Sequence, residues 1–397
     1  MSAAATVFVL NCGSSSLKYQ LVEPESATVL ASGLVEQIGE GTGHLTHRVG
    51  EAKHERDLAL ADHEAALVAV DELFAEHGPD LSTSGITAVG HRVVHGGPRF
   101  SEPVRIDDDV IAAVEELAPL APLHNSPALE GIRAAMSVHD TVPHVAVFDT
   151  AFFSDLPPAA YTYALDTELA ATHHIRRYGF HGTSHDYVSH AAADFLDADH
   201  AALKQIVLHL GNGASASAIA GGVAVETSMG LTPLEGLVMG TRPGDLDPGL
   251  PAYLNRQAGY GVDALDTLLN KKSGLLGLTG VNDFREVVRR AESGDERARL
   301  GFDVVVHRLV AYVGAYLAQL GGVDVLTFTA GIGENSAPLR AAVAERLAPL
   351  GFRLDADANQ HGSGPRRIST ADSPVTMLVV PTNEELSIAR QTLALVG

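Results

Sequence analysis

Residues 7–20 read VFVLNCGSSSLKYQ, and residues 206–218 read IVLHLGNGASASA. Each segment is a run of apolar residues, then a short stretch rich in Gly, Asn or Ser, then an alternating run. This pattern predicts a strand, a tight turn and a returning strand. Glycine lets the backbone approach a ligand closely and small hydroxyl residues add donors, so both turns suit a phosphate. Two such turns far apart predict two similar halves that face one polyphosphate.

Composition limits the classes of function. The chain has 397 residues, 46% of them hydrophobic, which predicts two or three domains with a sizeable core. Its formal net charge is −22, from 27 basic and 49 acidic residues, so we expect neither nucleic acid nor an anionic membrane as a partner. One cysteine permits no intramolecular disulfide. We see no signal peptide and no membrane-spanning stretch, which favours a cytoplasmic protein.

Strand and helix patterns repeat in the two halves. Each half is predicted to begin with consecutive strands and to continue with helices that alternate with strands, which indicates a duplicated α/β unit with mixed sheets. We place the boundary near residue 150 and expect a cleft between the halves. Single strands are expected at 7–11, 17–22, 29–35, 88–95, 144–149, 325–329 and 375–380, and a strand-loop-strand pattern is expected over 205–225. The helices are expected at 62–77, 108–117, 126–138, 183–196, 296–319 and 383–395, with Ser126 as a cap before Pro127.

Three loops are candidates for phosphate or nucleotide binding. In the first, Lys18 is suited to neutralise phosphate charge and Asn11 to reach a metal or its water. Taken alone, that loop is equally an ordinary Ser-rich turn. Cys12 more simply fills the turn than acts as a nucleophile. The second loop, 209–213, matches only part of a dinucleotide fingerprint. The third, 331–335, enters a helix, where Asn335 or Ser336 could act as an ordinary cap.

Arginines, histidines and acids supply the remaining candidates. Arg92 lies in an apolar strand and is costly unless paired, whereas Arg242 lies in a tight loop where Asp245 could pair with it. His181 and His185 have a helical metal spacing, but no HExxH pattern is present and Gly182 disfavours a helix there. A donor aimed at a ligand is the better interpretation of His181.

Two acidic residues complete the candidates. Asp149 ends a strand, and Glu384 begins the last helix, where acids are common for dipole reasons alone.

Seven blocks together closely resemble the acetate kinase family. They are residues 9–19, 91–97, 177–185, 209–213, 240–242, 328–335 and 382–386, in the order of that family and over nearly the whole chain. The resemblance implies two duplicated ribonuclease-H-like domains of the sugar kinase, Hsp70 and actin superfamily, which clamp ATP. The N-terminal domain would span 1–150 and regain helix 384–397, and the C-terminal domain would span 151–383.

The resemblance also implies a set of site residues. Catalysis would fall to Asp149, His181 and Arg242, and acetate would bind Arg92 beside a methyl pocket of Val94, Leu123, Phe180 and Pro233. Asn11 and Glu384 would hold Mg²⁺, with Mn²⁺ as an alternative. Nucleotide contacts would fall to Lys18, His209, Leu210, Gly211, Asn212, Gly213, Asp283, Phe284, Arg285, Gly331, Ile332, Gly333, Glu334 and Asn335. A homodimer is expected from the family.

The chain departs from the family pattern at two positions. Phe153 stands where a His is common, and Pro243 stands where a Ser is common. Neither is a catalytic position, so they bear on kinetics more than on reaction type.

The expected reaction is reversible in-line transfer of the γ-phosphoryl group of ATP to the acetate carboxylate, giving acetyl phosphate and ADP. A carboxylate is already ionised at neutral pH, so it needs positive charge and alignment more than a general base. The nearest alternative is a kinase for propionate or another short-chain carboxylate. A nucleotide-gated protein of the same fold is a further alternative, but it would not need Arg92, His181 and Arg242 together.

Overall fold

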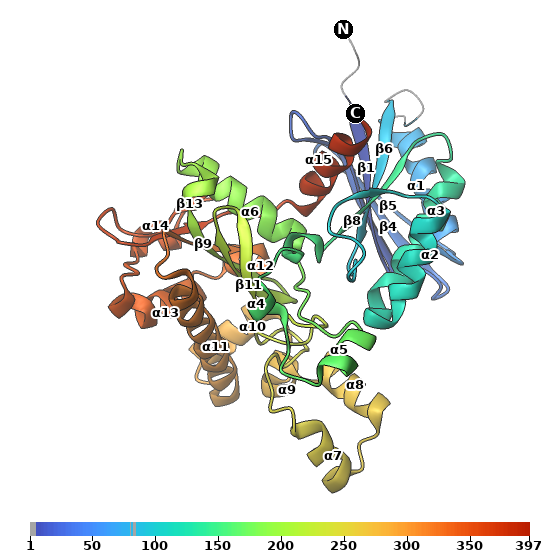
Figure 1. Cartoon of the computed structure of the whole chain (residues 1–397). Coiled ribbons are helices and arrows are strands. Elements are labelled where there is room, and N and C mark those ends of the chain that lie inside the picture. The colour runs from blue at the N-terminus through green and yellow to red at the C-terminus, as the bar shows by residue number, and fades with distance from the viewer. Residues whose placement is uncertain (1–4, 80, 82–84) are drawn as a thin grey trace. The chain divides into compact units, whose positions relative to one another are not determined.

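The computed structural model describes residues 5–79, 81 and 85–397, apart from the side chain of Leu123. These residues form two compact units. Unit 1 comprises Met1–Ser154 and Asn383–Gly397, and unit 2 comprises Asp155–Thr382. Each unit is built on one mixed sheet (Figure 1).

Unit 1 has an eight-stranded sheet in the order β5-β4-β3-β2-β1-β6-β8-β7. Strands β1 to β5 are antiparallel neighbours, whereas β6 and β8 run parallel to β1. The strands are β1 Thr6–Gly13, β2 Ser16–Glu23, β3 Thr28–Glu36, β4 Gly43–Val49, β5 Ala52–Leu58, β6 Ile86–Val93, β7 Val104–Arg105 and β8 His144–Phe148. The helices are α1 His63–His77, α2 Asp108–Leu117, α3 Pro122–Val138 and α15 Glu384–Val396, with short 3-10 turns η1 Ala118–Leu120 and η2 Ala151–Phe153.

Unit 2 has a six-stranded sheet in the order β11-β10-β9-β12-β14-β13. Its pairing directions repeat those of β3-β2-β1-β6-β8-β7 strand for strand. The strands are β9 Lys204–Leu210, β10 Ala214–Ala220, β11 Val223–Thr227, β12 Val325–Thr329, β13 Arg366–Arg367 and β14 Thr376–Val379. This repeat is the duplication that the sequence predicts, and the mixed α/β fold class is confirmed.

The helices of unit 2 are more numerous. They are α4 Pro158–Tyr161, α5 Thr167–Thr172, α6 Gly182–Phe195, α7 Leu250–Ala258, α8 Val262–Lys271, α9 Gly274–Thr279, α10 Phe284–Glu292, α11 Glu296–Leu320, α12 Ala330–Asn335, α13 Ala337–Leu347 and α14 Ala356–Gln360, with 3-10 turns η3 His200–Ala202 and η4 Ala348–Leu350.

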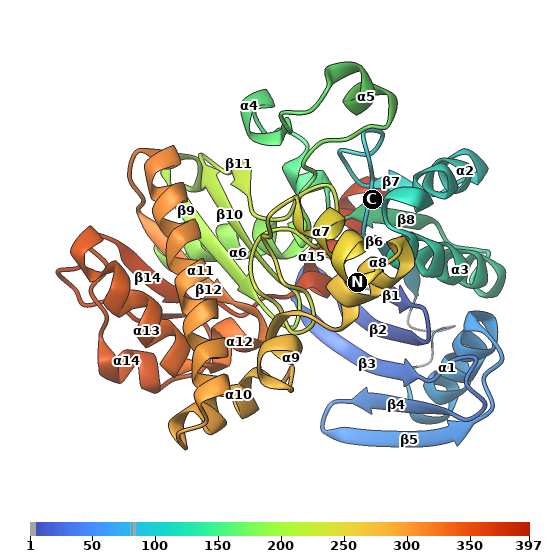
Figure 2. The same cartoon turned by 90° about the horizontal axis from the view of Figure 1, so that it is seen from below.

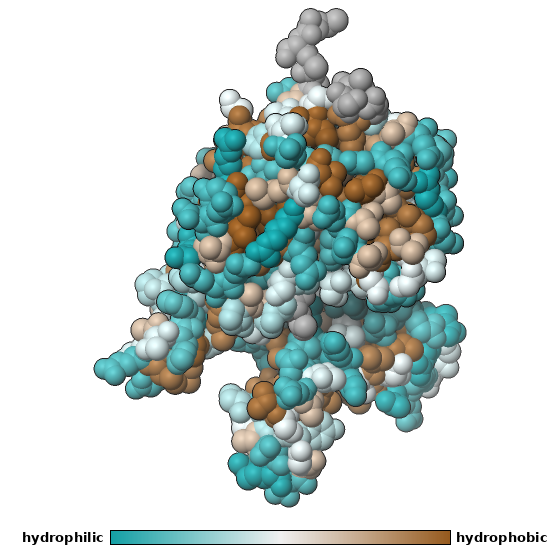
Figure 3. Space-filling model, turned by 90° about the vertical axis from the view of Figure 1, so that its right-hand side faces the viewer, coloured by the Kyte–Doolittle hydropathy of each residue, from teal (hydrophilic) through white to brown (hydrophobic). Residues whose placement is uncertain are grey.

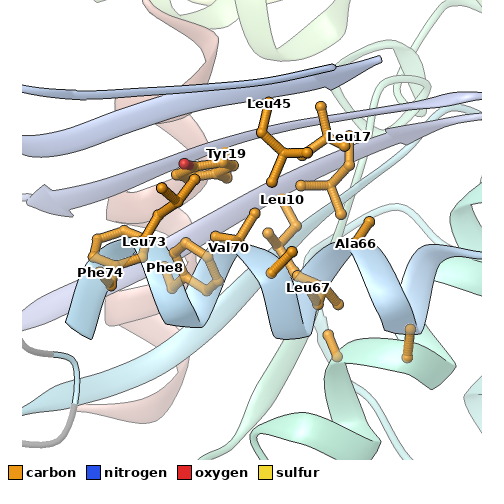
Figure 4. Packing of buried hydrophobic residues seen from close by; sticks show 14 of the residues in the cluster. Phe8, Leu10, Leu17, Tyr19, Leu45, Ala66, Leu67, Val70, Leu73 and Phe74 are labelled. Atoms are coloured by element: carbon orange, nitrogen blue, oxygen red, sulfur yellow. The ribbon is translucent and has the colours of Figure 1, made fainter. Parts of the chain in front are cut away.

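The core of unit 1 lies between helix α1 and the sheet. Asp62 caps α1 by accepting a hydrogen bond from the amide of Ala65, and apolar residues recur along the helix every three or four positions. Leu67, Val70 and Phe74 point from α1 toward Phe8 of β1 and its neighbours (Figure 4). The rings of Phe8 and Phe74 meet edge to face, 5.8 Å apart. This packing fixes the register of β1 and therefore of the turn that follows it.

Helix α15 packs on β1, β6 and β8 of unit 1, although it is the last element of the chain (Figure 1). The approach is close at Gly90 of β6, where a Cβ atom would lie 2.5 Å from Thr392 Oγ1. A side chain at residue 90 would therefore push α15 away from the sheet, and with it Glu384.

In unit 2, α11 lies along strands β9 and β10 (Figure 2) and α6 packs on β9 and β12. Among the described residues, α11 is the helix long and apolar enough to cross a membrane by length and composition alone. Its apolar residues, including Val306, Leu309 and Val313, are buried against the sheet and against α9, α10 and α13. It is therefore a core helix of unit 2.

Four local predictions were wrong. Helix α3 begins at Pro122, because a proline in the first turn needs no amide partner, so Ser126 is no cap and Pro127 lies inside the helix. The helix predicted at 183–196 is confirmed as α6, but it begins at Gly182, which we expected to disfavour a helix. The hairpin of β4 and β5 was missed because half-exposed, charged strands carry little apolar signal. The predicted loop 331–335 belongs to helix α12.

Hydrophilic side chains gather at the surface. The face of the molecule in Figure 3 carries hydrophilic residues over much of its area, between smaller hydrophobic patches.

Candidate active site

In unit 1, Arg92 and Asp149 meet at one edge of the sheet. The parallel strands β6 and β8 end side by side, and the amide of Asp149 donates to the Val93 carbonyl at 3.0 Å. Arg92 Nε donates to Asp149 Oδ1 at 3.0 Å and Nη2 donates to Oδ2 at 2.7 Å. The fork therefore pairs with the carboxylate through two hydrogen bonds, which resolves the cost of an Arg in a strand.

Glu384 joins this pair from the first turn of α15. Its Oε2 lies 3.7 Å from Arg92 Nη1. Burial raises the pKa of Glu384, Arg92 lowers it, and the carboxylates of Asp149 and Glu385 raise it again, so the net shift is upward. Burial lowers the pKa of Arg92, but Asp149 and Glu384 more than offset this effect, so Arg92 stays charged.

The first predicted loop is a two-residue hairpin between β1 and β2. Asn11 and Lys18 pair across it in the strand register. Lys18 forms an ion pair with Glu385, a residue that the sequence analysis missed. Cys12 lies in β1, next to Asn11. Burial, and then the negative charge of Glu130, raise the pKa of its thiol to about 12, which makes Cys12 a poor nucleophile.

The oxygen donors of this cluster suit magnesium better than zinc. Two cations, Lys18 and Arg92, face the three carboxylates of Asp149, Glu384 and Glu385. The excess negative charge and the largely buried Glu384 favour an added cation. Within the described ranges, no group of three or more His, Cys, Asp or Glu is arranged to hold a metal by itself. Magnesium commonly takes one or two protein ligands and completes its shell with water and phosphate, so Asn11 and Glu384 fit it.

In unit 2, the second loop joins β9 to β10 through residues 211–213. A Cβ atom at Gly213 would lie 2.8 Å from Arg242 Nη2 and 3.4 Å from His181 Nε2. Gly213 therefore leaves room for two donors to approach the same small volume. The ring of His181 stacks on that of His209, with centroids 4.2 Å apart.

Arg242 is a largely buried cation. Its Nη1 donates to the Pro233 carbonyl, and in the described part of the chain no carboxylate forms an ion pair with it. Burial lowers the pKa of Arg242. Pairing with Asp245 was one interpretation of the sequence, and it was wrong because Asp245 bonds to Arg308 and Tyr312. A largely buried guanidinium that has no carboxylate partner is suited to bind an anion.

Backbone hydrogen bonds hold the Arg242 loop at the two residues before Pro243. The amide of Met239 donates to the Arg242 carbonyl, the amide of Ser273 donates to the Thr241 carbonyl, and both bonds measure 3.0 Å. Gly244 follows Pro243 with φ +72°, a conformation that favours glycine. The other departure, Phe153, is fully buried in unit 1.

A cavity of about 640 Å³ lies in unit 2 next to the second loop. Eight of the predicted nucleotide residues line it, namely Gly211, Asn212, Asp283, Phe284, Arg285, Gly331, Ile332 and Asn335. Val288, Ser336 and Pro338 also line it and were missed. The volume is large enough for a nucleoside, and the apolar wall with a few amides suits one.

Other predicted residues lie beneath or beside this cavity. His209 and Leu210 end β9 and are buried. A Cβ atom at Gly333 would come within 3.7 Å of β9 atoms, so Gly333 lets α12 lie close to the strand. Glu334 accepts a hydrogen bond from the Thr382 amide at 3.3 Å, and burial raises the pKa of Glu334.

Arg340 supports α12 and was missed. This buried side chain donates to the carbonyls of Gly333 and Glu334 at 2.8 and 2.9 Å, and to Asn359. Burial, followed by the like charge of Arg366, lowers the pKa of Arg340 to about 10. An arginine within the apolar pattern of 339–347 was the signal that could have found it.

The predicted methyl pocket is described only in parts. Val94 follows β6 and is half-buried, Phe180 is buried before α6, and Pro233 is half-buried where it holds Arg242. The side chain of Leu123 lies outside the described residues. These four positions remain predictions.

A repeated mixed sheet, a nucleoside-sized cavity and a largely buried cation beside a glycine loop define a two-unit α/β kinase. The family model described as the acetokinase family matches residues 6–390. An acetate kinase of Leifsonia xyli subsp. xyli is 58% identical over 394 residues, which is 99% of each chain. The chain belongs to the acetokinase family.

Solved structures agree with this assignment. An acetate kinase of Porphyromonas gingivalis has a TM-score of 0.94 and 43% identity, covering 99% of this chain and 100% of that chain. A propionate kinase of Francisella tularensis subsp. tularensis has a TM-score of 0.93 and 41% identity, covering 98% and 99%. One of these two proteins is therefore named for acetate and the other for propionate.

Proposed function

We propose that this chain transfers the γ-phosphoryl group of ATP to the carboxylate of acetate, forming acetyl phosphate and ADP reversibly. The observation that carries the proposal is Arg242, a largely buried cation without an ion-pair partner among the described residues, next to the loop 211–213. The identity of 58% to an acetate kinase supports acetate as the acceptor.

In this proposal, Arg92 binds the acetate carboxylate and Asp149 positions Arg92. The acetate carboxylate is the nucleophile. It needs no base, because a carboxylic acid has a pKa of about 4 and is already ionised at neutral pH. Arg92 would hold it, using the guanidinium edge that faces Glu384 while Asp149 fixes the opposite edge. Asp149 therefore orients Arg92 in this proposal and accepts no proton.

Arg242 and His181 would bind the oxygens of the transferring phosphoryl group. One acetate oxygen forms a bond to the γ-phosphorus as the bond from phosphorus to the ADP oxygen breaks, and charge on the equatorial oxygens persists throughout. Donors already fixed near Gly213 stabilise that charge without reorganising. The adenosine would occupy the cavity between Phe284 and α12.

Magnesium, or manganese in its place, would be held by Asn11 and Glu384, in part through water. When bound, it supplies positive charge to the phosphates. Lys18 would contribute a further positive charge from β2. A cytoplasmic homodimer belongs to the proposal on family grounds, and sedimentation of the purified chain tests the dimer.

Propionate is the second candidate acceptor, because a propionate kinase shares 41% identity and a TM-score of 0.93. One methylene changes discrimination by only about 1–3 kcal/mol, so the substrates should overlap. The β-branched Val94 favours the smaller acid.

One assay tests the proposal. ATP, Mg²⁺ and acetate, propionate or butyrate are incubated with the chain, and hydroxylamine traps the acyl phosphate. We expect the highest kcat/KM with acetate. A higher kcat/KM with propionate would make propionate, and not acetate, the preferred acceptor. ADP release without any trapped acyl phosphate would refute a carboxylate acceptor.

A further inference from the structure

A row of hydrogen bonds in unit 2 connects His181 to the interior. His181 Nδ1 lies 2.8 Å from Ser215 Oγ, Ser215 Oγ lies 2.7 Å from His185 Nε2, and His185 Nδ1 lies 2.8 Å from Ser217 Oγ. Both serines point from one face of β10, because they are two residues apart on a strand, and both histidines come from the start of α6. We call these three residues beyond His181 the Ser215–His185–Ser217 relay.

The relay is closed to solvent. His185, Ser215 and Ser217 are all 0% exposed. Burial, followed by the nearby His209, lowers the pKa of His185 well below its ordinary value, so its ring is neutral. A neutral imidazole has one N–H and a serine has one O–H. Among the described residues, the Ser215 hydroxyl bonds only to the two histidines, so its proton has an acceptor only if Ser215 donates to one ring and accepts from the other. The bonds therefore all run in one direction along the row or all in the other.

Ser217 decides the direction. In the described part of the chain, the Ser217 hydroxyl has His185 Nδ1 as its hydrogen-bond partner and no second one. If Ser217 accepted this bond, its own proton would be buried without an acceptor, which is unfavourable. Ser217 therefore donates to His185 Nδ1, His185 Nε2 donates to Ser215, and Ser215 donates to His181 Nδ1.

We propose that the Ser215–His185–Ser217 relay fixes the tautomer of His181, with Nδ1 as an acceptor and the proton on Nε2. That nitrogen lies 3.4 Å from the Cβ position that Gly213 leaves empty, beside Arg242 Nη2. His181 is then a neutral donor next to a cation, which avoids two like charges in one place. The relay residues are positioning residues. Their effect on catalysis rests on the proposed function, whereas the tautomer itself does not.

The tautomer is measured directly in the free chain. Histidine labelled with ¹⁵N gives long-range proton–nitrogen correlations that distinguish the two neutral tautomers from the imidazolium, and a His181→Gln variant assigns the signals. Near neutral pH we expect His181 to be neutral with the proton on Nε2. A proton on Nδ1, alone or in an imidazolium, would overturn the proposal whatever the activity of the chain.

Kinetics of Ser217→Ala provide the second measurement. Ser189→Ala is the matched control, because Ser189 is also fully buried but bonds to the Asp186 carbonyl and to His200. We expect kcat of Ser217→Ala to fall about fivefold, the population change that one neutral hydrogen bond supports, with a mixture of His181 tautomers. The KM values should not change, because Ser217 lies three hydrogen bonds away from His181.

The outcomes separate the relay from the proposed function. Equal kcat for Ser217→Ala and Ser189→Ala, with an unchanged His181 signal, would refute the relay. Ser217→Thr keeps the hydroxyl and should restore both the signal and kcat. If Ser217→Ala does not fold, the His181 tautomer measured in the unsubstituted chain still tests the proposal. A chain with the expected tautomer but no acyl phosphate formation would keep the relay and refute the proposed function.

Discussion

The two units use one strand order for different polar chemistry. In unit 1, the parallel strands β6 and β8 bring Arg92 to Asp149, and the two charges neutralise each other. In unit 2, the corresponding strand β12 runs directly into α12, which lines a cavity, and Arg242 approaches Gly213 without a carboxylate partner among the described residues. The shared sheet sets where the strands end, and the side chains at those ends set what each unit can bind.

The first hairpins of the two units differ in the same way. Asn11 and Lys18 face each other across β1 and β2, and Lys18 is paired with Glu385. His209 and Ser215 face each other across β9 and β10, where neutral rings and hydroxyls are hydrogen-bonded. Unit 1 therefore suits a cation and a held carboxylate, whereas unit 2 suits a phosphate.

The strongest test of this difference is Arg242→Ala. We expect kcat to fall about 10³-fold or more while ATP still binds, because the contact with the phosphoryl group tightens in the transition state. Steady-state kinetics and calorimetric titration of nucleotide measure the two effects. Arg256→Ala on the exposed face of α7 is the control and should change neither. A kcat close to that of the control would remove Arg242 from catalysis.

Arg92→Ala tests the opposite unit. It leaves the carboxylate of Asp149 buried without its partner, so we expect the free energy of unfolding to fall by about 3 kcal/mol and the KM for acetate to rise. The double variant Arg92→Ala with Asp149→Asn should recover stability but not KM. A rise in the KM for ATP alone would contradict the placement of the carboxylate at Arg92.

Arg340→Met tests whether α12 needs its buried support. The carbonyls of Gly333 and Glu334 lose their donor, so we expect a loss of about 2 kcal/mol in unfolding free energy and a higher KM for ATP. Arg346→Met is the matched control, because Arg346 lies on the exposed side of α13, the helix that also carries Arg340. An unchanged KM for ATP in Arg340→Met would show that α12 is held by other contacts.

The smallest expected effect concerns Asp71 in unit 1. Burial raises the pKa of Asp71 to about 6. The folded chain therefore binds more protons than the unfolded chain between about pH 4 and pH 6, and its stability falls as the pH rises through that window. Asp71→Asn removes this loss, so it should be more stable than the parent above pH 6.

The gain for Asp71→Asn should be about 1 kcal/mol, since a third of the side chain is exposed and solvent screens it. Urea unfolding at pH 4 and pH 8 measures it, with Glu72→Gln on the exposed side of α1 as the control. An equal gain at both pH values would exclude the titration of Asp71 as the cause.

Local patterns predicted most of the elements that carry the site. Apolar runs predicted β1, β9 and β12, because these strands are buried on both faces and admit few polar residues. The start of α3 and the helix at 330–335 were not predicted, since a proline or glycine can either begin or break a helix and tertiary packing decides which. The hairpin β4–β5 was hidden by its charged surface residues.

The sequence by itself determined the family, the duplicated α/β pattern and the types of residue available for phosphate and carboxylate binding, because these depend on residue identity and short spacing. Only the tertiary structure decided the partners. Arg92 meets Asp149 across 57 positions, Asp245 bonds to Tyr312 across 67, and His185 bonds to Ser217 across 32. Contacts of that separation are set by how strands and helices pack, which no local pattern encodes. For the same reason, the direction of the hydrogen bonds that reach His181 became apparent only once α6 and β10 were seen together.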